Sequence, residues 1–269
     1  MEEDGPALCW QDDARWSGDI CDRESFRFPL FLVPAGRPEE LYGSLYYAKP
    51  SRPRQCLVVL PHWGHEGRFS LEWCHKLASG AASLRANAMV LHWPGTEDSD
   101  GDASEVTLEL LVDAVLSSRG VLAGRFGKIP CSVAGFGLGG TVAALAQARG
   151  GFYKTALVQP VLDPDRYFQT MEARARLSWA RGVPHRGWGF GDRVPAGLKA
   201  ASPTAVQESL QAARSTVAVI RDHSTEPLPP AVQEIAVHMK WPRPAGWDNG
   251  ALRRETLRFL CGRAPRSVM

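Results

Sequence analysis

The chain has 269 residues, and its 31 Lys and Arg nearly balance its 29 Asp and Glu, which leaves a formal net charge of +2. A nucleic-acid-binding protein is therefore not expected, because binding to phosphates needs a clustered surplus of basic residues. The hydrophobic fraction of 44%, which includes nine Trp and ten Phe, is large enough for a sizeable core and excludes a disordered chain.

Targeting signals and cysteine spacing exclude further classes. No stretch reaches the roughly 18 consecutive apolar residues of a membrane span, and the acidic start MEEDGPALCWQDDARW lacks the apolar segment of a secretory signal. The six cysteines are scattered, without the CxxC spacing of a zinc site or the density of a disulfide framework. The sequence therefore predicts a cytoplasmic protein with free thiols and no membrane span.

The first elements along the chain are an arm and a hairpin. Residues 1–24 are polar and aperiodic, which predicts a loosely ordered N-terminal arm. Segments 26–33 and 40–47 are rich in aromatic residues and enclose turn residues at 34–36. This pattern predicts an antiparallel hairpin at the edge of a sheet.

From Cys56 onward, short apolar runs alternate with helical patterns. Such runs are typical of parallel strands buried on both faces, and we predict them at 57–60, 88–92, 131–134, 156–160, 216–220 and 234–238. Helices are predicted at 71–82, 103–118, 141–148 and 249–260. The expected helix-terminal residues are Ser70, which caps the first helix, Asp102 and Glu105, which form a capping box for the second, and Gly120, which ends it. Alternating strands and helices specify an α/β fold with a mostly parallel sheet and right-handed crossovers.

One long segment, 166–203, interrupts this alternation. It contains Trp179, His185 and Trp188 but no strand pattern. A stretch of this length inside a compact α/β domain is usually functional rather than a passive connection. We therefore interpret it as a lid or cap that is inserted into a core formed by residues 25–165 and 204–263.

The turn Gly135-Phe136-Gly137-Leu138-Gly139 joins a predicted strand to a predicted helix, which is where an α/β-hydrolase carries its G-x-S-x-G nucleophile elbow. With this turn, the chain resembles the α/β-hydrolase superfamily over residues 26–262. The stretches 61–70 (PHWGHEGRFS) and 94–102 (PGTEDSDGD) are similar to stretches of the exosortase-A-system-associated hydrolases. The resemblance implies an α/β-hydrolase fold, with Glu66 and Asp98 at the family's acidic positions and Gly137 at the position of the nucleophile.

Two members of the hydrolase triad are missing from this pattern. Gly137 has no side chain that could attack a carbonyl, and the loop after the last predicted strand, 240–248, contains no His. His238 lies before that loop, inside the predicted strand, and Asp222 after the fifth strand can supply the acid. Because nucleophile and base must act together, Ser-dependent hydrolysis at this turn has no chemical basis.

Cofactor and metal sites are not expected either. The glycines at 135, 137 and 140 also satisfy the G-x-G-x-x-G pattern of dinucleotide sites. Such a site needs an acidic residue at the end of the next strand to bind the ribose, and this chain has Gln159 there. His62 and His65 are only two ligands, whereas a metal site needs three or four.

Polar and aromatic residues follow the strands at the carboxyl edge of the predicted sheet, where α/β proteins bind ligands. A His beside a carboxylate is the usual pair for moving protons near neutral pH, so the candidate catalytic residues are His65, Glu66, Asp222 and His223. The residues predicted to bind an apolar substrate are His62, Trp63, Trp93, Gly137, Leu138, Trp241 and Trp247. The alternative is structural: the acids cap helices and the tryptophans pack beneath the lid.

Three functions are compatible with these residues. The first is an enzyme that catalyses non-hydrolytic acid/base chemistry, such as cyclisation, elimination or acyl rearrangement, on an apolar or acyl-type small molecule. The second is a non-catalytic hydrolase-like binding protein. The third is a hydrolase with a relocated nucleophile or an activated water. The sequence is also compatible with a homodimer.

Overall fold

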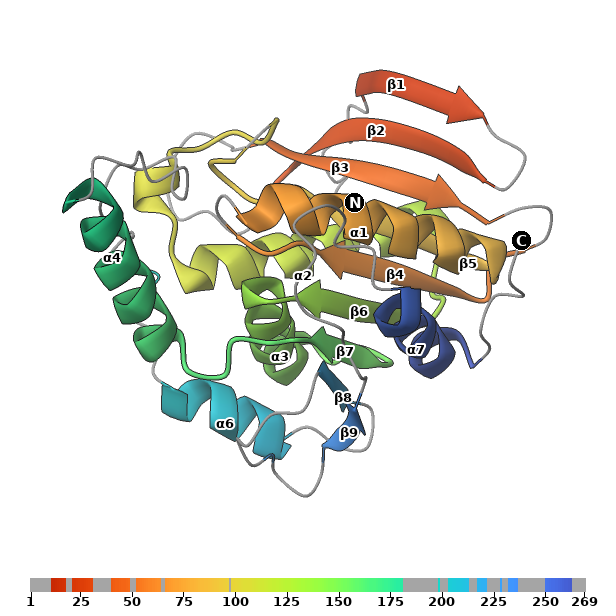
Figure 1. Cartoon of the computed structure of the whole chain (residues 1–269). Helices are drawn as coiled ribbons and strands as arrows, with labels where there is room; N and C mark the ends of the chain where they lie inside the picture. The colour runs from red at the N-terminus through yellow and green to blue at the C-terminus, as the bar shows by residue number, and fades with distance from the viewer. Residues whose placement is uncertain are drawn as a thin grey trace, which may run out of the picture.

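The computed structural model describes residues 11–17, 21–30, 40–48, 52–63, 66–96, 98–180, 198, 203–212, 217–221, 228, 232–236 and 250–262. These residues form one nine-stranded sheet with helices on both faces (Figure 1).

Three antiparallel strands form one end of the sheet: β1 (Gln11–Ser17), β2 (Asp22–Pro29) and β3 (Glu40–Tyr47). The predicted hairpin is confirmed as β2 and β3, but β1 and not this hairpin is the outermost strand. The prediction of a loose arm does not hold for residues 11–17, which pair with β2. An edge strand needs only backbone hydrogen bonds to its neighbour, so the polar sequence of β1 gave no periodic signal.

Six parallel strands form the rest of the sheet: β4 (Gln55–Leu60), β5 (Ala86–Leu91), β6 (Cys131–Phe136), β7 (Thr155–Val158), β8 (Val217–Arg221) and β9 (Gln233–Ala236). The spatial order is β1-β2-β3-β5-β4-β6-β7-β8-β9. All six predicted strands are confirmed, and every residue of β4 and β5 is buried, as expected of strands covered on both faces. In the sheet, β4 lies between β5 and β6. The chain runs from β4 to β5 on one side of β4 and then crosses to β6 on its other side. The connections that leave β4 and β6 therefore run in opposite directions.

The helices are α1 (Glu66–Ser83), α2 (Leu108–Phe126), α3 (Leu138–Gly150), α4 (Pro164–Ala180), α6 (Pro203–Ala212) and α7 (Gly250–Cys261), with a short 3-10 helix η1 (Ala103–Glu105). One apolar cluster packs α2, α3 and α6 on one face of the sheet, and a second cluster packs α1 and α7 on the other. Helix α4 extends away from the sheet (Figure 1). Among the helices that the described residues form, none is both long enough and apolar enough to cross a bilayer.

Helix α2 begins later than the sequence predicts. Thr107 is its N-cap, and the side-chain oxygen of Thr107 accepts a hydrogen bond from the Leu110 N–H at 3.0 Å. Asp102 caps η1 instead, by accepting from the Ser104 N–H at 2.8 Å. The predicted capping box is therefore wrong, because the turn that starts at Asp102 is a separate 3-10 helix.

Helix α2 also ends later than predicted. A glycine in a helix interior costs about 1 kcal/mol relative to alanine, so Gly120 alone was expected to end the helix. The next two side chains, Val121 and Leu122, are buried in the core, and burying two such side chains contributes roughly 3–6 kcal/mol. The helix therefore continues to Phe126 and ends at Gly127, where φ is +76°.

Thr107→Ala is expected to lower the free energy of unfolding by about 1 kcal/mol, because the N–H of Leu110 loses its acceptor at the helix start. Thr107→Ser keeps the hydroxyl and is expected to stay within a few tenths of a kcal/mol of the parent. Urea unfolding followed by circular dichroism measures both variants. Equal stability of Thr107→Ala and the parent would contradict the capping role.

An ion pair between a buried carboxylate and a partly exposed guanidinium joins the hairpin to α2. Glu24 of β2 is 3% exposed, and Nη2 of Arg125 lies 2.8 Å from both of its carboxylate oxygens. The Tyr47 hydroxyl donates to the same carboxylate. The guanidinium carbon of Arg125 also lies 5.5 Å from the ring centroids of Phe26 and Tyr47. These contacts fix the hairpin against the end of α2.

Candidate functional site

Two loops meet where the connections of β4 and β6 diverge. His62 follows β4 by two residues, and Gly137 lies between β6 and α3. Leu60 pairs with Gly135 in the parallel ladder, so the two loops begin side by side. Ligands of open α/β sheets bind outside the carboxyl ends of the strands, at the point where the strand order reverses. This point is therefore the candidate functional site.

The turn between β6 and α3 is tight, and glycine is required at several positions. Gly137 has φ +56° and ψ −121°, a conformation that residues with a side chain rarely adopt. A Cβ on Gly135 would lie 2.6 Å from the nitrogen of Gly140, and a Cβ on Gly139 would lie 2.8 Å from the carbonyl oxygen of Leu60. These glycines allow α3 to approach β4 and β6 closely.

The imidazole of His62 fills the space into which a side chain at position 137 would point. A Cβ built on Gly137 would lie 2.9 Å from Cγ and from Nε2 of His62, and closer still to Cδ2. Carbon atoms in good contact are about 3.5–4.0 Å apart, so the imidazole and such a Cβ cannot occupy their positions together. His62 is 5% exposed. The imidazole of His62 can therefore occupy this position only because residue 137 has no side chain.

Three hydrogen bonds hold His62 in this position. Its backbone N–H donates to Oγ of Ser70 at 2.7 Å. The prediction that Ser70 caps the first helix is wrong, because α1 begins at Glu66 and Ser70 lies inside it. Nδ1 lies 2.8 Å from the carbonyl oxygen of Trp63, and because a carbonyl only accepts, Nδ1 carries the proton. Nε2 lies 3.0 Å from the hydroxyl oxygen of Tyr167. In the neutral ring Nε2 is then an acceptor, and Tyr167 donates to it.

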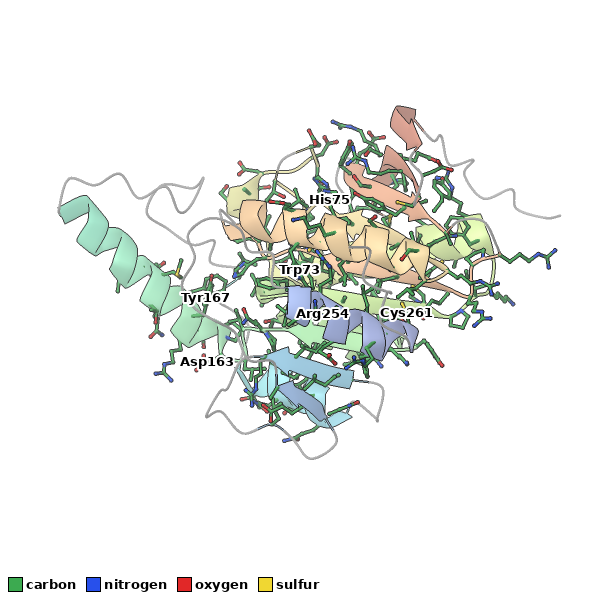
Figure 2. All side chains as sticks on the ribbon, turned by 45° about the vertical axis from the view of Figure 1, so that its right-hand side comes forward. Trp73, His75, Asp163, Tyr167, Arg254 and Cys261 are labelled. Atoms are coloured by element: carbon green, nitrogen blue, oxygen red, sulfur yellow. The ribbon has the colours of Figure 1, made fainter. Side chains whose placement is uncertain are left out.

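Tyr167 belongs to α4 and also lines a cavity. The cavity has a volume of about 330 Å³ and is bounded by Pro160, Val161, Leu162, Asp163, Arg166, Tyr167, Thr170 and Met171. Figure 2 shows Asp163 and Tyr167 together at the end of α4 that meets the core. Asp163 accepts from the backbone N–H of Arg166 at 2.9 Å, so its carboxylate caps α4. Tyr167 thus belongs to the cavity lining and also contacts the imidazole of His62 through its hydroxyl.

Several predicted site residues cannot be placed. His65, Asp222, His223, Trp241 and Trp247 lie outside the described residues, and their assigned roles stay predictions. Glu66 is the first residue of α1.

Other predicted binding residues belong to the core. Trp63 is 0% exposed and Trp93 is 2% exposed, and the Trp93 indole N–H donates to the Pro61 carbonyl oxygen at 2.9 Å. The side chain of Leu138, the first residue of α3, is also fully buried. These side chains pack the strand ends rather than line the cavity beside Tyr167, because an apolar ring next to a buried strand is stabilised by burial.

Cysteine thiols do not replace the missing hydroxyl in the described part of the chain. Burial raises the pKa of Cys56 and of Cys131 to about 12 and that of Cys261 to about 11, and it also raises the pKa of Cys74. Such thiols are protonated at neutral pH and are weak nucleophiles. Among the described residues, no group of three or more His, Cys, Asp and Glu could hold a metal ion.

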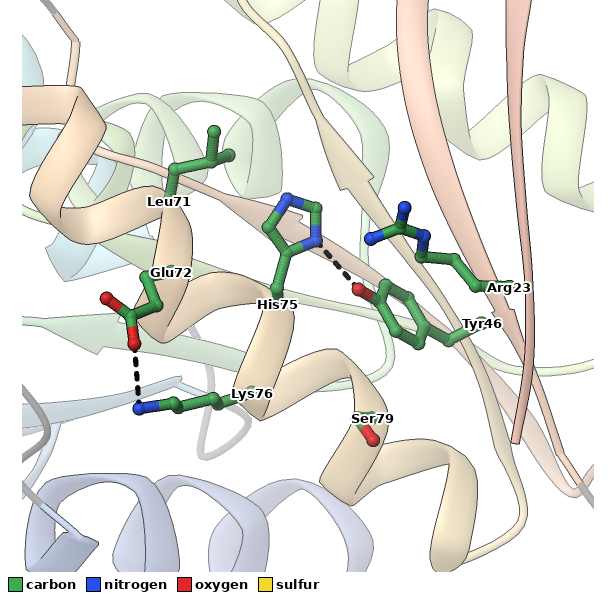
Figure 3. A pocket seen from close by; sticks show the side chains of 7 residues that line it. All are labelled: Arg23, Tyr46, Leu71, Glu72, His75, Lys76 and Ser79. Atoms are coloured by element: carbon green, nitrogen blue, oxygen red, sulfur yellow. Dashed lines mark hydrogen bonds and ion pairs between the residues drawn. The ribbon is translucent and has the colours of Figure 1, made fainter. Parts of the chain in front are cut away.

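A second cavity, of about 620 Å³, lies between α1 and the hairpin (Figure 3). Its polar side chains pair with one another: Lys76 lies 2.9 Å from Glu72, and the Tyr46 hydroxyl lies 2.9 Å from Nδ1 of His75. Burial raises the pKa of Tyr46 above its usual value. This cavity flanks the middle of α1, away from the carboxyl ends of the strands, so it is not the site at His62.

No motif in the sequence pointed to Tyr167, and His62 was predicted only as a substrate-binding residue. Tyr167 lies at the start of the segment that was interpreted as a lid, four residues after Asp163. The available signal was the spacing of Asp163 and Tyr167 across one helical turn. That spacing does not reveal that α4 meets the loop after β4, because this contact joins residues 105 positions apart.

Comparisons with known proteins bear on the fold. No protein-family model matches the chain, and no curated protein matches it either. An esterase from Pyrococcus furiosus has a similar structure, with a TM-score of 0.67, 12% identity and coverage of 96% of this chain and 100% of that chain. The α/β-hydrolase GrgF from a Penicillium species has a TM-score of 0.56 at 12% identity and covers 90% of this chain and 99% of its own.

A third similar structure is a peroxisomal α/β-hydrolase from Saccharomyces cerevisiae, with a TM-score of 0.54, 12% identity and coverage of 81% of this chain and 83% of that chain. Identities this low establish architecture and not activity. The mostly parallel sheet, the flanking helices and the N-terminal hairpin agree with these structures. The chain therefore has the α/β-hydrolase fold.

Proposed function

We propose that the protein is an enzyme that catalyses non-hydrolytic proton-transfer chemistry on a small apolar molecule, with Tyr167 and His62 as the proton-carrying pair. The observation that carries this proposal is the hydrogen bond of 3.0 Å between Nε2 of His62 and the hydroxyl of Tyr167, next to an elbow position occupied by Gly137. Cyclisation, elimination and acyl rearrangement all need a proton to be removed at one atom and delivered at another, which such a pair supplies.

Loss of the nucleophile supports a non-hydrolytic reaction. In this proposal Gly137 is the elbow position of the hydrolase fold, where a serine would attack a carbonyl. Position 137 has no side chain, and the His62 imidazole fills the space that a serine would need. A serine-based acyl-enzyme intermediate therefore has neither an attacking atom nor room to form at this turn.

Proton transfer through the pair uses two atoms, the hydroxyl oxygen of Tyr167 and Nε2 of His62. The hydroxyl oxygen of Tyr167 takes a proton from a substrate in the cavity while its own proton passes to Nε2 of His62. An ordinary tyrosine and an ordinary histidine differ by about 3.5 in pKa, which corresponds to about 5 kcal/mol for moving the proton alone. The two transfers therefore occur together, and the bond from Nδ1 to the Trp63 carbonyl stabilises the imidazolium that results. The reverse sequence returns the proton to the product.

The walls of the cavity support an apolar substrate. Val161, Leu162 and Met171 contribute apolar surface, and Arg166 is the basic residue among those that line it. Its volume of about 330 Å³ is at the lower end of the range for small-molecule pockets. A substrate of modest size with one polar or anionic group fits this lining.

A non-catalytic binding protein is the second candidate, and one observation favours it. His62 is only 5% exposed, so a substrate has little direct access to the imidazole. If Tyr167 merely fixes the ring, the cavity can bind a ligand without changing it. The two candidates differ in whether the protein accelerates a proton transfer.

The proposal is tested with 5-nitrobenzisoxazole, a small apolar compound that opens to a coloured phenolate when a base removes the proton from C3 and the N–O bond breaks. The parent protein is expected to accelerate this opening above buffer. Tyr167→Phe and His62→Gln are each expected to lower the rate about 100-fold or more, since positioned acid/base groups contribute roughly 10²–10⁴-fold. Absorbance at increasing protein concentration measures the rate.

Two controls accompany this assay. Tyr42→Phe removes a phenol hydroxyl from β3, where the Tyr42 ring packs edge-on against His92, and its rate is expected to match the parent. p-Nitrophenyl acetate is expected to be hydrolysed no faster by the parent than by His62→Gln. Acceleration that survives in both Tyr167→Phe and His62→Gln, or no acceleration by the folded parent, would rule out the pair as a proton-transfer catalyst and favour the binding protein.

A further inference from the structure

A third cavity lies at the amino edge of the sheet, opposite the edge that carries His62. Its volume is about 490 Å³, and its lining includes Arg54, Arg85, Tyr153 and Lys154. Figure 2 shows Cys261, which also lines it, on the side of the molecule opposite Tyr167. Nothing in the proposed acid/base chemistry uses this cavity.

The lining of this cavity is strongly basic. Three of its residues are Arg or Lys, and none is Asp or Glu. The sequence around each lining residue is also free of acids, in the segments 49–56, 83–88, 127–132, 151–156 and 259–269. In a chain whose net charge is only +2, this is a local surplus of positive charge, which attracts anions.

Two helix ends at the cavity both carry partial negative charge, but this charge does not neutralise the basic lining. Helices α1 and α7 end at Ser83 and Cys261, which both line the cavity. A helix C-terminus carries roughly half a negative charge, so the two ends offset about one of the three cations. Lys154 donates to the Phe259 carbonyl oxygen at 2.6 Å, and an ammonium has two further donors to offer.

Arg85 shows backbone strain and an unsatisfied donor at this cavity. Its φ is +71°, in the left-handed region that non-glycine residues seldom adopt. Its Nη2 donates to the Arg52 carbonyl oxygen at 3.1 Å, while Nε is buried and has no hydrogen-bond partner among the described residues. This left-handed residue ends α1, as is common just past a helix C-terminus, and the buried unpaired N–H costs about 1–3 kcal/mol. The Arg85 guanidinium therefore has hydrogen-bonding capacity that the described residues do not satisfy.

We propose that this cavity is a binding site for a polyphosphate group, held by Arg54, Arg85 and Lys154. Guanidinium groups bind phosphate oxygens through charge-assisted hydrogen bonds, and they do so in pairs of parallel donors. Tyr153 is 54% exposed and lines the same cavity, so its ring offers a face on which the base of a nucleotide can stack. The ligand is therefore inorganic polyphosphate or a nucleoside triphosphate.

Isothermal titration of the full chain with tripolyphosphate and with ATP tests this site. Both probes are expected to bind the parent, and Arg54→Ala and Arg85→Gly are each expected to weaken binding tenfold or more, as loss of a charge-assisted contact does. Glycine adopts a φ of +71° without strain, so Arg85→Gly is expected to unfold at the same temperature as the parent or above it. This variant therefore separates loss of the ligand from loss of the fold.

Arg254→Ala is the matched control, because it removes the same charge from the exposed face of α7, away from the cavity lining. Its affinity is expected to stay within twofold of the parent. Tighter binding of ATP than of tripolyphosphate, with the difference lost in Tyr153→Ala, identifies a nucleotide; equal affinities identify the phosphate chain alone. The proposal is overturned if neither probe binds the parent, or if Arg254→Ala weakens binding as much as Arg54→Ala does.

Discussion

Gly137→Ser is expected to lower the free energy of unfolding by roughly 2–6 kcal/mol. About 1–3 kcal/mol comes from placing a side chain at φ +56° and ψ −121°. A further 1–3 kcal/mol, roughly, comes from the overlap of the new Cβ with the imidazole of His62. The measurement is urea unfolding followed by tryptophan fluorescence and by circular dichroism.

The two contributions can be separated. Gly137→Ala adds the same Cβ without a hydroxyl and is expected to cost as much as Gly137→Ser. In the double variant Gly137→Ser with His62→Ala, the overlap is gone, so the total loss is expected to be smaller than the sum of the two single losses, by about 1 kcal/mol or more. A Gly137→Ser protein as stable as the parent would show that the imidazole does not occupy this space.

A gain of esterase activity is not expected from Gly137→Ser alone. The structure places the His62 ring where the hydroxyl would have to stand, so the serine can enter only by displacing the ring. The same displacement would break the hydrogen bond between Nε2 and Tyr167.

Arg125→Ala is expected to lower the free energy of unfolding by about 3–5 kcal/mol, which is the usual cost of leaving one charge of a buried pair without its partner. Glu24 is 3% exposed, and Arg125 Nη2 lies 2.8 Å from both of its carboxylate oxygens. Loss of the stacked guanidinium over Phe26 and Tyr47 adds to this effect. Urea unfolding measures the change.

The matched comparison uses a double variant and an exposed pair. Glu24→Gln combined with Arg125→Met removes both charges and is expected to cost less than Arg125→Ala, because no unpaired charge remains buried. Arg258→Ala breaks the exposed pair with Glu255, whose contact is 2.7 Å, and is expected to cost less than 1 kcal/mol, as exposed pairs usually do. If Arg125→Ala and Arg258→Ala cost the same, the buried carboxylate of Glu24 does not depend on Arg125.

The sequence predicted the parallel part of the fold because that part is encoded locally. Buried strands such as β4 and β5 appear as continuous apolar runs, and glycines at 135, 137 and 139 mark a tight strand-to-helix turn. Strand β1 was not predicted because it is polar, and its pairing with β2 depends on a neighbour rather than on its own pattern. Helix ends were also misplaced where a second local option existed, as at Asp102 and Thr107.

The candidate site was predicted only in part, for a different physical reason. The sequence indicated that Gly137 stands at the apex of the turn, and it placed His62 at the same edge of the sheet. It did not indicate that the imidazole packs against Gly137, nor that Tyr167 reaches Nε2 from α4. Both contacts join residues that are distant along the chain, and only the tertiary arrangement of β4, β6 and α4 brings them together.

The tautomer of His62 tests the central claim most directly. In a protein labelled with ¹⁵N in its histidine rings, long-range proton–nitrogen NMR spectra distinguish Nδ1 from Nε2, and His62→Gln assigns the signal. We predict a neutral ring with the proton on Nδ1 and a bare Nε2 whose nitrogen shift changes in Tyr167→Phe. A proton on Nε2 in the neutral ring, or a His62 signal unaffected by Tyr167→Phe, would contradict a proton-carrying pair at this site.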